Sequence, residues 1–150
     1  MSIFDSFSIN ASGMTAQRYR MDIISENVAN ANTTRTQDGT PYRRKIVTFE
    51  EKGPAVGKFS SFFGVATDKY TKQGVKVTSV QDDTYTQMNK VYDPSHPDAD
   101  ENGYVLYPNV NIVTEMTNLI DASRSYEANA TAFNASKSIA MKGLEMSNGS

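Results

Sequence analysis

The chain has 150 residues, 38% of them hydrophobic, with 15 Lys and Arg against 17 Asp and Glu, a net charge of −2. This balance gives no basic field for nucleic acid or an anionic membrane surface. The absence of cysteine excludes a disulfide framework and thiolate metal sites, and a single histidine limits other metal sites. The low hydrophobic content favours a modest core with extended flanks over one compact core.

The first twenty residues contain an acidic residue and polar breaks where a signal peptide has a basic segment and an apolar segment. We therefore expect no cleaved signal peptide. No run approaches the roughly 18 apolar residues that a membrane span needs, so we expect no direct membrane insertion. A protein of this kind leaves the cytoplasm, if it does, by a route that does not cleave its N-terminus.

The N-terminal segment carries a heptad pattern typical of a pairing helix. One series of positions seven residues apart comprises Phe7, Met14, Met21 and Val28, and the intermediate series comprises Ile3, Asn10, Gln17, Ile24 and Ala31. Asn and Ala beside this seam are expected to allow close helix approach and to fix the register. The β-branched residues of the stretch 32–36 disfavour helix, so the helix should end near Asn30.

A second apolar stripe, formed by Ile9, Ala16 and Ile23, lies roughly 200° round the same helix. One partner helix cannot cover both stripes. The second stripe therefore either folds against the middle of the chain or packs against neighbouring subunits.

The middle of the chain changes to short β-rich runs separated by Gly, Pro, Asp and Asn. The runs are "YRRKIVTF" from Tyr42, "VKVTSV" from Val75 and "MNKVYD" from Met88. They predict a small antiparallel β module over residues 33–108. A long loop at about 51–73, with Phe59, Phe62 and Phe63, is expected to be an ordered insertion or a contact loop.

The C-terminal segment is again helical in pattern, starting at about Val110 because Pro108 cannot lie inside a helix. Its two heptad series are Met116, Ser123, Ala130, Lys137 and Leu144, and Ile112, Leu119, Tyr126, Phe133 and Ala140. We predict a mainly α fold with a β-rich insertion. Its long terminal helices, in residues 1–32 and 109–150, pair as an antiparallel coiled coil and form one discontinuous domain.

The sequence contains few candidate catalytic or metal-binding residues. "DADENG" from Asp98 resembles the first half of a calcium loop, but its second half lacks the required glutamate, so a plain turn is expected. A metal-dependent hydrolase would need His96, Asp98 and Asp100 to bind metal tightly, and no second histidine or nucleophile accompanies them. We predict no catalytic, cofactor or metal site and no enzymatic activity.

Several runs together resemble the bacterial flagellar basal-body rod proteins, and in particular a proximal-rod member. They are "NASGMTAQRYRMDIISENVANANTTRT", "GTPYRRK", "VYDPSHPDADENGYVLYPNVN" and "EMTNLIDASRSYEANATAFNASKS". The resemblance covers residues 7–50 and 74–146. The stretch from about Glu51 to Gln73 is longer than the family pattern leads one to expect.

The resemblance implies a non-enzymatic structural subunit of the proximal rod, located in the flagellar basal body in the periplasm. It implies export through the flagellar type III apparatus without signal cleavage, and assembly with copies of itself and with other proximal and distal rod proteins. A secreted coiled-coil adaptor or effector is the alternative. It would share the heptads but form a soluble oligomer of closed symmetry.

The heptads and the resemblance together predict two sets of contact residues. The residues expected to pair the two helices within the subunit are Phe7, Met14, Met21, Ile24, Val28, Met116, Leu119, Tyr126 and Phe133. The residues expected to pack against neighbouring subunits are Ile9, Ile23, Ile120 and Ile139.

Overall fold

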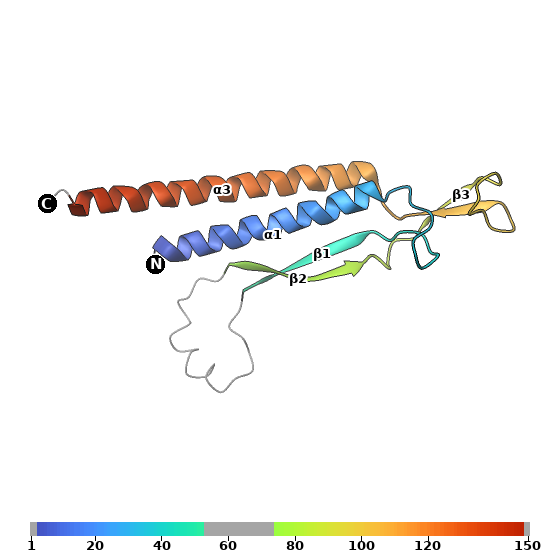
Figure 1. Cartoon of the computed structure of the whole chain (residues 1–150), viewed down its shortest axis with the longest axis horizontal. Helices are drawn as coiled ribbons and strands as arrows, with labels where there is room; N and C mark the ends of the chain where they lie inside the picture. The colour runs from blue at the N-terminus through green and yellow to red at the C-terminus, as the bar shows by residue number, and fades with distance from the viewer. Residues whose placement is uncertain (1–2, 53–73, 149–150) are drawn as a thin grey trace, which may run out of the picture. The chain divides into compact units, whose positions relative to one another are not determined.

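The computed structural model describes residues 3–52 and 74–148. Two long helices, α1 (Ile3–Ala29) and α3 (Ile112–Asn148), stand at the two ends of the chain (Figure 1). Between them lie the strands β1 (Lys45–Glu51), β2 (Val75–Asp82), β3 (Asn89–Tyr92) and β4 (Tyr104–Tyr107). The expected contact loop with Phe59, Phe62 and Phe63 lies outside the described residues. Within the described ranges, no helix is long and apolar enough to cross a bilayer.

The strands form two small antiparallel sheets, β1 with β2 and β3 with β4. In the second sheet Tyr92 stands opposite Tyr104, and Val91 stands opposite Val105, which is fully buried. The three predicted strands are confirmed. Strand β4 was not predicted.

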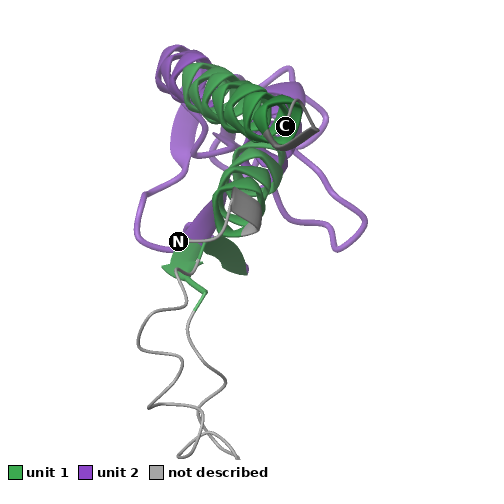
Figure 2. Cartoon of the chain, turned by 90° about the vertical axis from the view of Figure 1, so that its left-hand side faces the viewer, with its two compact units in different colours: residues 1–18, 49–78, 123–150 green, residues 19–48, 79–122 purple. Residues whose placement is uncertain are grey.

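The chain groups into two compact units, coloured separately in Figure 2. Unit 1 comprises residues 1–18, 49–78 and 123–150, and unit 2 comprises residues 19–48 and 79–122. Each unit contains part of both helices and of strands β1 and β2, and unit 2 also contains β3 and β4. This grouping does not test the predicted division of the chain into a discontinuous helical domain and a β module. That division stays a prediction.

In unit 1, helices α1 and α3 approach each other closely. The rings of Phe7 and Phe133 have centroids 5.0 Å apart. A Cβ atom added at Gly13 would lie 2.7 Å from Oδ1 of Asn129, so only glycine fits at this position without a shift of the asparagine. A glycine at residue 13 thus brings the α1 backbone against a polar side chain of α3.

Helix α1 also contacts β2 in unit 1, through Ser12. The Ser12 hydroxyl accepts a hydrogen bond from the backbone N–H of Val75 at 3.1 Å and donates one to the carbonyl of Ile9 at 2.7 Å. A Cβ atom at Gly74 would lie 1.9 Å from Ser12 Oγ, closer than any real contact. Glycine at residue 74 is therefore required for the start of β2 to reach the helix.

The helix ends follow local capping chemistry. Helix α1 ends at Ala29, as predicted, and the Asn30 side chain donates to the Glu26 carbonyl and accepts from the Thr33 hydroxyl. Helix α3 begins at Ile112, two positions after the predicted start at Val110. The reason is that Asn111 acts as the N-cap, its side-chain oxygen accepting from the backbone N–H of Thr114 at 3.2 Å.

Candidate functional site

The most extensive buried polar cluster in unit 2 joins both helices to the start of β1. We call it the asparagine hub, and it consists of Asn27, Tyr42, Arg44, Lys45, Asp83, Asn109 and Glu115. Asn27 lies in the last turn of α1, Glu115 lies in the first turn of α3, and Asn109 lies between β4 and α3. The others come from residues 42–45, where β1 begins, and from Asp83, directly after β2.

Asn27 is the centre of the asparagine hub. Its side-chain oxygen accepts from the backbone N–H of Lys45 at 2.8 Å and from the Tyr42 hydroxyl at 2.8 Å. Its amide nitrogen donates to the Lys45 carbonyl at 2.9 Å and to the Glu115 carboxylate at 3.2 Å. Both donors and both acceptor sites of the amide are used, so the buried side chain leaves no polar atom unsatisfied.

Asn109 also binds the backbone near the start of β1. Its oxygen accepts from the backbone N–H of Arg44 at 2.9 Å, and its nitrogen donates to the carbonyls of Asp83 at 2.9 Å and Thr86 at 3.2 Å. Two asparagine side chains therefore satisfy the backbone of two successive residues, Arg44 and Lys45, where β1 begins.

The buried charges of the hub are paired. The Glu115 carboxylate accepts from Arg44 Nε at 2.8 Å, which compensates the cost of burying it. Hydrogen bonds from the backbone and hydroxyl of Thr86, with others from Tyr85 and Arg44, hold the pKa of Asp83 below its usual value. Burial, followed by the nearby acidic side chains, raises the pKa of Tyr42. The phenol therefore stays protonated and donates to Asn27.

The hub explains part of the asparagine-rich pattern that the sequence assigns to helix pairing. Asn27 does contact α3, through Glu115, but three of its four hydrogen bonds go to Tyr42 and Lys45. The signals available in the sequence were the asparagines of "ENVANANTT" and "YPNVN" and the glutamate at residue 115. None of these reveals its partner.

The predicted pairing residues have different environments. In unit 1 the Phe7 and Phe133 rings are in contact, and in unit 2 Ile24 is buried. Half-buried side chains within this set are Met14, Met21, Val28, Leu119 and Tyr126. Met116, in contrast, is 55% exposed, because Glu115 and not Met116 faces the core at this turn of α3. The assignment of these residues to a coiled-coil seam stays a prediction.

The predicted subunit-packing residues divide between the two helices. On α1, Ile9 and Ile23 are half-buried, and Ile9 lines a cavity of about 470 Å³ with Gly74 and Val75 of the same chain. On α3, Ile120 and Ile139 are 55% and 67% exposed. Ile9 thus lies near the chain's own β2, whereas the two α3 residues face outward.

The acidic run after β3 forms a turn, as expected. Asp100 accepts from the backbone N–H groups of Asn102 at 2.9 Å and Tyr104 at 2.8 Å, and Gly103 adopts a positive φ of 78°. His96 Nδ1 accepts from the backbone N–H of Asp98 at 3.1 Å. Over the described residues, no group of three or more His, Asp or Glu side chains is arranged to hold a metal ion.

Two family matches cover the ends of the chain. Residues 7–36 match the family described as "Flagella basal body rod protein", and residues 101–146 match "Flagellar basal body rod FlgEFG protein C-terminal". These ranges contain most of α1 and α3, together with Asn27, Asn109 and Glu115 of the hub.

Curated relatives match over nearly the whole chain. The flagellar basal-body rod protein FlgC of Bacillus subtilis is 44% identical, covering 97% of this chain and 99% of the relative. The FlgC proteins of Borreliella burgdorferi and Salmonella typhimurium are 42% and 39% identical, covering 99% and 97% of this chain and 100% and 98% of the relatives. Because both chains align over almost their full lengths at this identity, the chain belongs to the FlgC family of flagellar basal-body rod proteins.

Proposed function

We propose that this chain is a structural subunit of the proximal part of the flagellar basal-body rod. The observation that carries the proposal is the match to FlgC proteins over nearly the whole of both chains. In this function the subunit assembles with copies of itself and with other rod proteins into the shaft that crosses the periplasm. It reaches the growing rod through the flagellar type III export apparatus, and it needs no enzymatic activity.

The terminal helices supply the pairing that this role requires. Contacts in unit 1 join Phe7 to Phe133 and Gly13 to Asn129, so higher numbers on α1 meet lower numbers on α3. The same order holds in unit 2, where Arg20 donates to Asn118 and Asn27 to Glu115. These contacts support an antiparallel coiled coil. The hub then makes its register specific, since a slip would separate buried polar groups from their partners.

An apolar face of α3 is free for contacts between subunits. Val113, Met116 and Ile120 are 55% or more exposed at spacings of three and four residues, which places them along one side of the helix. They lie away from Glu115 and Ala122, which are buried. We assign Ile120 and Ile139 to contacts with neighbouring rod subunits and retain Ile9 and Ile23 as candidates for the same role.

A deletion strain tests the proposed function. Without this protein, cells should still build the membrane ring but neither rod nor hook, as seen by electron microscopy of isolated basal bodies. Expression of the wild-type chain in the same strain should restore rods and swimming. Normal motility in the deletion strain would remove the assignment, and motility restored by secretion-blocked protein would remove the export step.

A further inference from the structure

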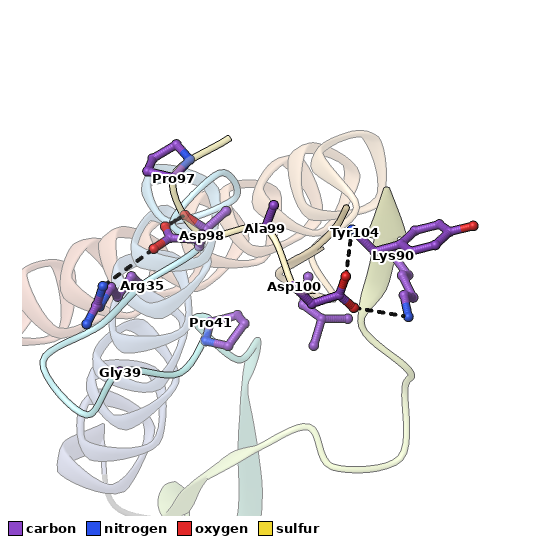
Figure 3. A pocket seen from close by; sticks show the side chains of 11 residues that line it. Arg35, Gly39, Pro41, Lys90, Pro97, Asp98, Ala99, Asp100 and Tyr104 are labelled. Atoms are coloured by element: carbon purple, nitrogen blue, oxygen red, sulfur yellow. Dashed lines mark hydrogen bonds and ion pairs between the residues drawn. The ribbon is translucent and has the colours of Figure 1, made fainter. Parts of the chain in front are cut away.

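A groove of about 360 Å³ in unit 2 has a lining whose charges balance (Figure 3). Arg35 lies 3.7 Å from the carboxylate of Asp98. Lys90 lies 3.6 Å from the carboxylate of Asp100. Because each cation has a carboxylate of the same groove beside it, the lining favours neither an anionic nor a cationic partner.

The cavity of about 470 Å³ in unit 1, beside Ile9, has a lining of a different kind. Its apolar walls include Ile9, Gly74 and Val75. Its polar side chains are Gln17 of α1, Glu51 at the end of β1 and Asn129 of α3. The lining therefore contains one carboxylate and no cation.

The carboxylate of this cavity differs from its neighbour in the chain. Glu50 forms an ion pair with Lys76, whose ammonium lies 3.5 Å from its carboxylate. Over the described ranges, Glu51 has no such ion pair, and its side chain is exposed at the cavity. The negative charge of Glu51 is thus available to a partner.

The two amide side chains add oxygens that lack a hydrogen-bond donor. The Gln17 oxygen is buried and has no hydrogen-bond partner. Asn129 donates through its nitrogen to the Ser125 carbonyl at 2.8 Å, but within the described part of the chain its oxygen, which lies against Gly13, accepts from no donor. The cavity therefore combines a negative charge with two unused acceptors.

A buried oxygen without a donor lowers the stability of the free subunit. An apolar residue at position 17 would avoid this cost, because it has no acceptor to satisfy. A donor that enters the cavity from outside would also remove the cost. The end of a glutamine side chain rotates between two broad minima, so the Gln17 oxygen can turn toward such a donor.

We propose that this cavity receives the ammonium group of a lysine from a neighbouring rod subunit. The three N–H donors of a lysine match the oxygens of Glu51, Gln17 and Asn129. The methylene stem of a lysine matches the apolar walls at Ile9 and Val75. Charge complementarity selects a cation, since the lining holds Glu51 and no positive charge. The contact requires assembled neighbours and therefore rests on the proposed function.

Zero-length carbodiimide coupling, which joins a carboxylate to a lysine in contact with it, is the first test. In isolated basal bodies, it should couple Glu51 to a lysine, and mass spectrometry of the digest should identify the product. The purified monomer should not give this product. A Glu51 product that forms equally in the monomer would show that the lysine belongs to the same chain and would overturn the proposal. The absence of any Glu51 product from basal bodies would overturn it as well.

Charge reversal in the deletion strain is the second test. Glu51→Lys should leave the melting temperature and secretion of the subunit unchanged, because the side chain is exposed, but should abolish swimming. Glu51→Asp keeps the charge and should swim. The matched control is Glu50→Lys, which reverses the adjacent carboxylate outside the cavity and should also swim. Full motility of Glu51→Lys would refute lysine binding here while leaving the rod assignment intact, whereas motility of the strain without any copy would refute the rod assignment.

Replacement of the buried acceptor is the third test. Gln17→Met should melt at or above the wild-type temperature as a free subunit, because it removes an oxygen without a donor, yet it should reduce swimming in the deletion strain. The control is Gln81→Met, which replaces an exposed glutamine of β2 and should change neither property. A lower melting temperature of Gln17→Met would show that the oxygen already has a donor in the free subunit. That result, or wild-type swimming by this variant, would overturn the proposal.

Discussion

At the scale of single residues, the Asn27 side chain makes the backbone hydrogen bonds that a neighbouring strand would otherwise make. Its amide binds both the N–H and the C=O of Lys45, as the backbone of a paired strand would. The first residue of β1 is therefore satisfied by a helix side chain. We therefore expect Asn27 to be a stability determinant of unit 2.

Replacement of Asn27 by alanine should destabilise the subunit by about 3 kcal/mol, because it removes the acceptor of the Lys45 N–H and of the Tyr42 hydroxyl. Urea unfolding followed by circular dichroism measures this difference. The control is Asn32→Ala, which removes an exposed asparagine of the same run and should change stability by less than about 0.5 kcal/mol. Equal effects of the two substitutions would contradict the role of the hub.

Asp83 gives the hub a dependence on pH. Its hydrogen bonds lower its pKa in the folded state, so the stability it contributes is complete above the unfolded pKa of about 4 and is lost as pH falls through the folded value. The Asp83→Asn variant should therefore have a lower free energy of unfolding than the wild type near neutral pH. This difference in free energy should become smaller in acid. Urea unfolding at several pH values tests this, and a gap independent of pH would argue against it.

At the scale of elements, the position of β2 depends on the contact between Gly74 and Ser12. Gly74→Ala would place its Cβ atom 1.9 Å from Ser12 Oγ and should cost about 1–3 kcal/mol in the free energy of unfolding. In a Ser12→Gly background the same substitution should cost much less. Gly143→Ala, where an added Cβ meets nothing within 4 Å, is the control and should not destabilise. An unchanged cost in the Ser12→Gly background would show that this contact does not set the position of β2.

The outer face of α3 leads to a different kind of prediction. Ile120→Asp and Ile139→Asp should leave the melting temperature of the free subunit nearly unchanged, because both side chains are mostly exposed in it. In the deletion strain they should prevent rod assembly, because a charge would be buried at a subunit contact. Ile24→Asp should instead unfold the subunit itself, since Ile24 is buried within the chain. Swimming by both surface variants would exclude this face as an interface.

At the scale of the whole molecule, stability should be uneven along α3. The segment from Glu115 to Ala122 belongs to unit 2 and begins and ends with a buried residue, whereas residues 141–146 are exposed throughout. Few buried contacts allow local opening at low free energy. In hydrogen exchange on the free subunit, amides of residues 115–122 should therefore be protected more strongly than those of residues 141–146. Uniform protection along α3 would contradict this expectation.

The sequence alone determined the elements that depend on local pattern. Heptad spacing located both helices, the residues after Ala29 marked the end of α1, and alternation with turn residues located β1, β2 and β3. The quoted motifs indicated the rod family. These features follow from neighbouring residues, whose periodicity and capping chemistry act over a few positions along the chain.

Which residues contact one another was decided by the tertiary structure alone. A heptad places a residue on a face of a helix but does not say which side of that face meets another element, so Met116 is exposed while Glu115 is buried. The hydrogen bonds of Asn27 reach Lys45 and Glu115, which are 18 and 88 positions away in the chain. A buried amide can be satisfied by many donors and acceptors, and only the packed chain selects among them, because the selection depends on which groups become close when water is excluded.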